Sequence, residues 1–167
     1  MVNNIELKKA VDFLKKKKCI SIEYNDNVQF LMDAKEEVVT ESQLNLTTEN
    51  FTLLISSDRM ANQCIKDIPE VAWDMMDYAT TPLTLILDGG QFVSKRWINE
   101  DGSLAIQKNT KGILHDLVAM YNKPIACFQF SKEDQIPSDF KIMVKQSMIQ
   151  EKIIRIRLNG EIEILAN

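Results

Sequence analysis

The chain has 167 residues, of which 45% are hydrophobic and 26% charged, a composition typical of one folded domain over residues 1–167 and not of a disordered chain. Its net charge of −4 argues against a protein that coats nucleic acid without preference, because phosphate contacts need clustered Lys and Arg. No apolar run approaches the roughly 20 residues of a membrane span and no secretory signal begins the chain, so we expect a cytoplasmic protein without a membrane partner.

The chain begins with a predicted helix and hairpin. Apolar residues recur at helical spacing, and lysines 15–18 follow them, as suits the negative end of a helix. "CISIEY" at 19–24 and "NVQFLM" at 27–32 read as the two strands of a hairpin. Residues 35–50 are polar without a period and predict a loop, which could leave a cleft open or fill it. The helix-spaced residues are Leu7, Ala10, Val11 and Leu14.

A buried strand and two helices are expected next. "FTLLIS" at 51–56 predicts the strand, and Ser57 is suited to cap a helix whose inner face holds Met60, Ala61, Cys64 and Ile65. Pro69 is suited to the first turn of a second helix. That helix should bury Val71, Ala72, Met75 and Met76.

The middle of the chain predicts a strand, a hairpin and a fourth helix. "PLTLIL" at 82–87 is the strand, and "QFVSKRWI" at 91–98 with "SLAIQ" at 103–107 predicts a hairpin closed by "NEDG". The helix has Ile113, Leu114, Leu117, Val118 and Tyr121 on one face. His115, the only histidine, falls on the opposite face, so we expect it to be solvated and to have no role in a relay or a metal site.

The last third contains two clear strand signals. "IACFQF" at 125–130 is a strand, and two alternating stretches flank Asn159-Gly160, a strong hairpin signal. Residues 138–148 fit a helix or an extended segment equally well. Strands that interleave with helices, through both hairpins and longer crossovers, predict an α+β or α/β fold with a twisted mixed sheet flanked by helices.

The three cysteines and the charge distribution limit the chemistry. Cys19, Cys64 and Cys127 are odd in number and far apart, which fits neither a disulfide framework nor a zinc site. Residues 1–100 carry a net charge of −5 and residues 101–167 carry +1, so an anion site is expected to draw on the second half.

Three stretches resemble one known family. "IPEVAWDMMDYATTPLTLIL" at 68–87 is similar to its helix and Pro-Gly-Pro-Leu-Thr strand. "DGSLAIQKNTKGILHDLVAMYNKPIACFQFS" at 101–131 is similar to its Ser-x-Ala-x-Arg strand, the next helix and its Lys-Pro-Leu-x-Ser-Thr-Ser-Ala-Asn strand, and "EKIIRIRLNGEIEIL" resembles its closing strands. On these residues the chain resembles the YrdC/YciO-like proteins. The residues retained are Pro82, Leu83, Thr84, Ser103, Ala105, Lys123 and Pro124.

The resemblance implies a site and a chemistry. Enzymes of this family use ATP, threonine and bicarbonate to make threonylcarbamoyl-adenylate, the donor for a tRNA adenosine modification, so ATP and Mg²⁺ are expected only if that activity is retained. The family's cleft positions carried over to this chain are Thr84, Ser103, Gln107, Cys127 and Ser131. Cys127 could be read as a nucleophile, but an apolar strand without a histidine partner favours a buried structural cysteine.

Several cations of the family pattern are absent. Leu44, Leu46 and Asn50 stand at the three basic positions of its Lys-x-Arg-Pro-x-x-Lys-Pro-Leu segment, and Gln107 replaces the Arg of its Ser-x-Ala-x-Arg strand. "EYNDNVQFL" also lacks the glycine and the Pro-Thr pair of its first hairpin. Losing four charge-assisted bonds should remove roughly 6 kcal/mol or more from triphosphate recognition, even if such losses are imperfectly additive.

Three functions therefore stay open. The first is a catalytically degenerate domain, a pseudoenzyme that binds tRNA, double-stranded RNA or a nucleotide in the family cleft. The second is a variant synthase in which Lys95, Arg96 or Lys108 replaces the missing cations. The third is a scaffold that binds another protein. In the first, the positive rim would consist of Lys95, Arg96, Lys108, Lys111, Lys123 and Lys132.

Overall fold

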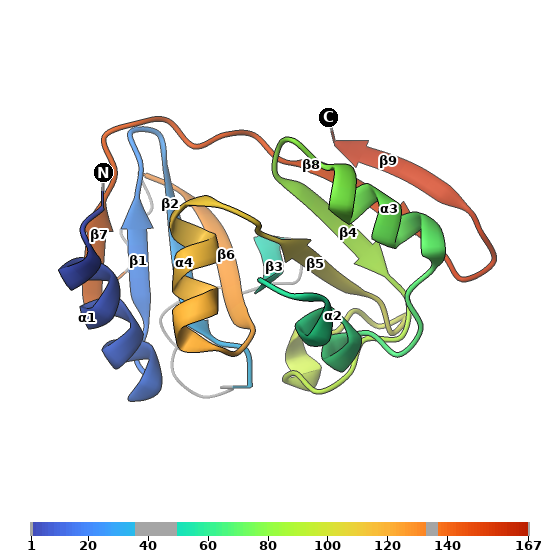
Figure 1. Ribbon diagram of the computed structural model, residues 1–167, viewed down its shortest axis with the longest axis horizontal. Helices are drawn as coiled ribbons and strands as arrows, with labels where there is room; N and C mark the ends of the chain where they lie inside the picture. The colour runs from blue at the N-terminus through green and yellow to red at the C-terminus, as the bar shows by residue number, and fades with distance from the viewer. Residues whose placement is uncertain (1, 36–49, 133–136, 167) are drawn as a thin grey trace.

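The computed structural model describes residues 2–35, 50–132 and 137–166 (Figure 1). The predicted loop at 35–50 lies almost entirely outside these residues, as do Leu44 and Leu46. Four α-helices and nine strands make up the described part. None of its helices has the length and apolar character needed to cross a membrane.

The N-terminal helix and hairpin are confirmed. Helix α1 (Asn4–Lys15) begins with a capping box, in which Asn3 Oδ1 accepts from the Glu6 N–H at 2.8 Å, and it buries the four predicted residues. Strands β1 (Ile20–Glu23) and β2 (Asn27–Asp33) form the antiparallel hairpin.

The predicted strand and two helices that follow are present in the structure, but one residue expected to be buried is not. Strand β3 (Phe51–Ile55) is fully buried, and Ser57 caps helix α2 (Asp58–Cys64) by accepting from the Met60 N–H. Helix α3 (Glu70–Tyr78) follows Pro69. It buries Ala72 and Met76, but the expectation for Val71 is wrong, because that side chain is exposed.

The predicted hairpin of 91–98 with 103–107 is wrong. Strand β4 (Leu83–Leu87) and strand β5 (Leu104–Lys108) pair with each other, while residues 91–98 form an irregular segment with a 3₁₀ turn at Lys95–Trp97. Trp97 is buried because its ring stacks on Phe51, 5.6 Å between centroids, and meets Phe128 edge-on. Tertiary packing, rather than strand pairing, therefore accounts for the apolar residues of this segment.

The remaining elements settle the ambiguous segment. Helix α4 (Gly112–Tyr121) leads to strand β6 (Ile125–Ser131), and residues 138–148 include the extended strand β7 (Phe140–Met143). Strands β8 (Lys152–Ile156) and β9 (Ile162–Ala166) form the predicted antiparallel hairpin around Asn159-Gly160.

The strands form one mixed sheet in the order β7-β1-β2-β6-β3-β5-β4-β8-β9. The parallel pairs are β1 with β7, β3 with β5 and β4 with β8, and each needs a long crossover. Helices α1 and α4 pack side by side at one half of the sheet, and α2 and α3 lie by the other half (Figure 1). The mixed sheet with flanking helices is thus confirmed.

Candidate functional site

A polar cleft of about 390 Å³ opens over the sheet strands β2, β3, β4, β5, β6 and β8. Amide and hydroxyl side chains dominate its wall, and within the described part of the chain no Lys, Arg or His lines it. One carboxylate, that of Glu151, lies in it. The lining residues are Asn27, Asn50, Phe51, Thr52, Thr84, Ile86, Asn99, Ala105, Gln129, Phe130, Ser131, Glu151 and Ile153.

Strand register brings the polar groups of the cleft together. Thr84 of β4 lies directly opposite Gln107 of β5 and opposite Ile153 of β8, and directly opposite residues share a face. Glu151 precedes Ile153 by two residues, so it lies on the same face. Residues that are far apart in sequence thereby surround one carboxylate.

The side chains of Thr84, Gln107, Gln129 and Glu151 form a hydrogen-bonded group that we call the Glu151 cluster. The Thr84 hydroxyl donates to Glu151 Oε2, and Gln107 Nε2 donates to the same oxygen at 3.0 Å and to Thr84 Oγ1 at 3.2 Å. Gln129 Nε2 donates to Oε1 at 3.4 Å. Burial raises the pKa of the Glu151 carboxyl, and the hydrogen bonds from Thr84 and Gln107 oppose that rise.

Two other predicted positions border this cluster. Cys127 is buried, burial raises the pKa of its thiol, and the nearby Glu151 carboxylate raises it further. The thiol is therefore protonated at neutral pH and unsuited to nucleophilic attack. Ser131 is exposed at the rim of the cleft.

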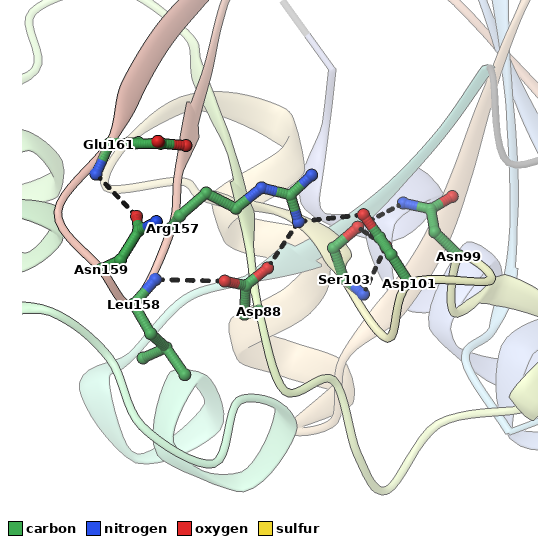
Figure 2. A network of polar contacts seen from close by, with 8 residues as sticks. All are labelled: Asp88, Asn99, Asp101, Ser103, Arg157, Leu158, Asn159 and Glu161. Carbon is green, nitrogen blue, oxygen red and sulfur yellow. Dashed lines mark hydrogen bonds and ion pairs between the residues drawn. The ribbon is translucent and has the colours of Figure 1, made fainter.

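Ser103 does not line the cleft and belongs to a second polar network, which Figure 2 shows. Its hydroxyl donates to Asp101 Oδ1 at 2.6 Å and accepts from Asn99 Nδ2 at 2.9 Å. Arg157 Nη1 bridges Asp88 at 2.8 Å and Asp101 at 2.9 Å, which ties the turn of the β8–β9 hairpin to the loops after β4 and before β5. Hydrogen bonds from Ser103, assisted by Arg157, lower the pKa of Asp101 to about 2. Of the Figure 2 residues, only Asn99 lines the cleft.

The structure does not gather the six predicted cations at the cleft. Lys108 is 13% exposed and pairs with Asp58 at 2.6 Å and Asp77 at 3.4 Å. It lines a separate hollow together with Lys111. Lys132 approaches Glu23 at 3.7 Å.

The other three cations lie apart from one another. Arg96 rests on the Trp97 ring, 5.4 Å from its centroid, and Lys95 is exposed beside it. Lys123 lines a pocket at the far end of β2. The RNA-binding role of these six residues stays a prediction.

His115 also lies outside the cleft lining. It is half-buried rather than solvated, and its Nδ1 is 2.8 Å from the backbone oxygen of Asn109.

The cleft does not fit the triphosphate and metal that the resemblance implies. Asn50, which stands at a basic family position, does line the cleft, but with a neutral amide. Arg155 follows Ile153 by two residues on the same face of β8 and is not among the lining residues. Among the described residues, no group of three or more His, Cys, Asp or Glu side chains could hold a metal ion. Phosphate oxygens would thus face a carboxylate in place of cations.

Glu151 is the residue that sequence reasoning missed. It is the first residue of the stretch that resembles the family's closing strands, but it was not among the cleft positions carried over, and it lies just before the alternating strand of the C-terminal hairpin. The available signal was a single acidic residue at the start of that strand, which becomes informative only once β8 is paired with β4.

Known structures identify the fold. No family model matches the sequence, and no curated protein matches it. Sua5 from P. abyssi complexed with L-threonine has a TM-score of 0.74 at 17% identity, over 99% of this chain and 54% of that one. YciO from E. coli has a TM-score of 0.70 at 16% identity, over 100% of this chain and 93% of that one.

HypF in its phosphate- and nucleotide-bound form has a TM-score of 0.71 at 13% identity, over 95% of this chain and 28% of that one. The chain spans about half the length of the Sua5 structures that it matches. The YrdC-like fold expected from the resemblance is confirmed.

Proposed function

We propose that this YrdC-like domain binds a small ligand bearing an ammonium group, most simply an α-amino acid, and does not make an adenylate from ATP. The observation that carries the proposal is the Glu151 carboxylate inside a cleft whose described lining holds no cation. In family terms the domain is catalytically degenerate, as the missing basic positions predict.

The hydrogen bonding of Glu151 leaves room for a ligand. A carboxylate offers about four acceptor positions, two on each oxygen. Oε2 accepts from Thr84 and Gln107, and Oε1 accepts from Gln129. With respect to the described residues, one acceptor position on Oε1 therefore stays available to an N–H group of a ligand.

Electrostatics decides the sign of the ligand charge. At about 4 Å and an effective dielectric constant of about 20, two unit charges interact by about 4 kcal/mol. Glu151 attracts an ammonium group by an amount of this order and repels a phosphate by the same amount. The Asn27 amide and the second N–H of the Asn99 amide, whose other N–H bonds Ser103, supply donors for the carboxylate of an amino acid. A protein of the same fold, Sua5 from P. abyssi, has been crystallised with L-threonine.

The test is a calorimetric titration of the purified protein at pH 7 with three ligands. L-threonine should bind saturably. 3-Hydroxybutyrate, which keeps the carboxylate and the hydroxyl but lacks the amine, should bind at least tenfold more weakly, since a hydrogen bond to a charged group contributes about 1.5 to 3 kcal/mol. ATP with Mg²⁺ should release no pyrophosphate, and any heat from ATP should be unchanged in Glu151→Gln, because the cleft does not bind it. Saturable ATP binding with pyrophosphate release would instead support the variant synthase.

A nucleoside, alone or as an unpaired base of RNA, is the second candidate for the cleft. Phe130 lines the cleft beside the amides of Asn50 and Gln129, and an aromatic face next to amides suits a nucleobase. Because Glu151 repels phosphate, the cleft should bind adenosine more tightly than ATP. Adenosine binding that is unchanged in Gln129→Ala, a variant of the cleft wall, would remove this candidate.

A further inference from the structure

A second hollow of about 460 Å³ lies at the opposite end of β2 from the cleft. Asn27, at the start of β2, lines the cleft, and Asp33, at its end, lines the second hollow. Six residue steps along a strand span about 20 Å, so the two sites are separate. We call the hollow the basic pocket, because Lys17, Lys35, Arg59 and Lys123 line it.

Within the described part of the chain, the charge of the basic pocket is largely uncompensated. Asp33 is its one carboxylate among the described lining residues, and it is buried and already hydrogen-bonded. It accepts from the Tyr121 hydroxyl, from the Lys35 backbone N–H at 2.9 Å and from Lys17 Nζ at 3.1 Å. Four cations against one occupied carboxylate leave the lining with a net charge of about +3 at neutral pH.

The cations come from separate elements, and helix ends do not explain all of them. Lys17 and Lys123 follow α1 and α4, whose C-terminal ends favour a positive charge. Lys35 follows a strand. Arg59 lies in the first turn of α2, where the helix disfavours a cation, and its Nη2 donates to Asn122 Oδ1 at 3.1 Å. That bond joins the guanidinium to another residue of the pocket wall.

The backbone is strained at Phe92, in the wall of this pocket. Among the described residues, three non-glycine residues have positive φ, namely Lys17 (59°), Phe92 (57°) and Asn122 (60°), and all three line the basic pocket. Lys17 and Asn122 lie at the ends of helices α1 and α4, where a left-handed residue is usual, whereas for a bulky residue such as Phe92 outside a helix end it is an outlier. Such outliers persist where the surroundings fix them and cluster at ligand sites.

Phe92 is held in place on both sides. Its neighbour Gln91 donates its backbone N–H to the Cys64 oxygen at 2.8 Å, and Ser94 donates its backbone N–H to the Ala34 oxygen at 3.1 Å. The Phe92 side chain itself is 67% exposed, so burial of the ring does not account for the strained backbone. The result is an aromatic ring exposed at the pocket wall.

We propose that the basic pocket binds a nucleoside monophosphate, with the phosphate among the Lys and Arg side chains and the base on the Phe92 ring. Guanidinium and ammonium groups are the usual partners of phosphate oxygens, and aromatic rings are the usual platforms for bases. The volume lies within the range of about 300 to 1,000 Å³ that is typical of small-molecule sites. The same chemistry is presented by a free mononucleotide and by the 5′-phosphorylated end of an RNA strand.

The test is a calorimetric titration of the full chain with AMP, adenosine and inorganic phosphate, at low salt because screening weakens such contacts. AMP should bind more tightly than adenosine or phosphate. The double variant Lys35→Gln/Arg59→Gln should weaken AMP about 100-fold, at about tenfold per charge-assisted contact. The charge-matched control Lys8→Gln/Lys145→Gln, on exposed residues outside the pocket, should change it less than about threefold.

A second variant separates the contribution of the Phe92 ring to AMP binding from that of the cations. Phe92→Gly removes the ring and relieves the strained backbone, so it should weaken AMP, leave inorganic phosphate unchanged and not lower the melting temperature. AMP binding no tighter than that of adenosine, or an equal loss in the control variant, would overturn the proposal. RNA oligonucleotides with 5′-phosphate and 5′-hydroxyl ends then identify the source: a large preference for the phosphorylated strand over AMP indicates an RNA end, and equal affinities indicate a mononucleotide.

This inference does not rest on the proposed amino-acid ligand. The variants of the basic pocket should leave threonine binding unchanged, and Glu151→Gln should leave AMP binding unchanged, so that the two can fail separately.

Discussion

Replacing Glu151 by Gln tests the role of the cleft most directly. The substitution keeps the shape of the side chain and removes its charge, so an ammonium ligand loses a charge-assisted hydrogen bond. Such bonds contribute about 1.5 to 3 kcal/mol, which corresponds to a loss of about 10- to 150-fold in affinity for L-threonine. The matched control is Glu161→Gln, which removes the same charge from an exposed turn outside the cleft and should leave the affinity unchanged.

The assay is isothermal titration calorimetry at several pH values. Burial raises the pKa of Glu151, so the carboxylate protonates at a higher pH than an ordinary glutamate does. Threonine affinity of the wild type should therefore fall as the pH drops through the raised pKa, while the variant should show no such dependence. Equal affinities of wild type and Glu151→Gln at pH 7 would refute the reasoning, because the ligand could not then contact this carboxylate as a cation.

Three further predictions concern stability. A raised pKa means that the folded state binds more protons than the unfolded state, so the ionised Glu151 costs stability as the pH rises above about 4.5; urea unfolding should show that the stability difference between Glu151→Gln and wild type grows with pH. The pH dependence of the contribution of Asp101 to stability has the opposite sign. Its pKa is lowered to about 2, so its contribution is present above pH 3.8 and is lost as the pH falls towards 2. With a side chain 43% exposed the loss should be about 1 kcal/mol or less, and Asp101→Asn should flatten it in acid unfolding curves. Phe128→Ala should cost about 3 to 5 kcal/mol in the free energy of unfolding, because it empties a buried aromatic position between Phe51 and Trp97; a loss below 1 kcal/mol in a urea titration would contradict the packing described.

Local signals in the sequence were enough to predict the elements whose hydrogen bonds join residues close in sequence. The first helix follows from its apolar spacing and the lysines at its end, and the C-terminal hairpin follows from Asn159-Gly160. The fold class also follows, because hairpins and crossovers together require a mixed sheet.

The segment 91–98 shows where local signals fail. Its aromatic and β-branched residues are typical of a strand, yet Trp97 is buried against Phe51 and Phe128, and Phe92 has a positive φ that no strand allows. Strand β5 instead pairs with β4 and β3. The strand propensity of these residues was outweighed by their packing against elements distant in sequence.

The cleft was only half predictable for a related reason. Thr84 and Gln107 were identified through motifs, whereas Glu151 joins them through a parallel pairing of β8 with β4 that no motif indicates. The number of Lys and Arg residues in the second half of the chain suggested a positive rim, but this number does not tell where the fold places each side chain. Lys108 is instead paired with Asp58 and Asp77.

The position of Glu151 immediately before β8 has a consequence for how the domain acquires function. Thr84 and Glu151 are 67 residues apart in sequence, so the cleft receives its charge only when the C-terminal hairpin has docked on β4. Contacts of such separation are slow to form, because loop closure must precede them. During synthesis the central strands exist before the segment that completes the ligand site. Binding in the cleft is thus a sensitive reporter of complete folding. A chain in which every element except the last hairpin has folded would be compact but unable to bind.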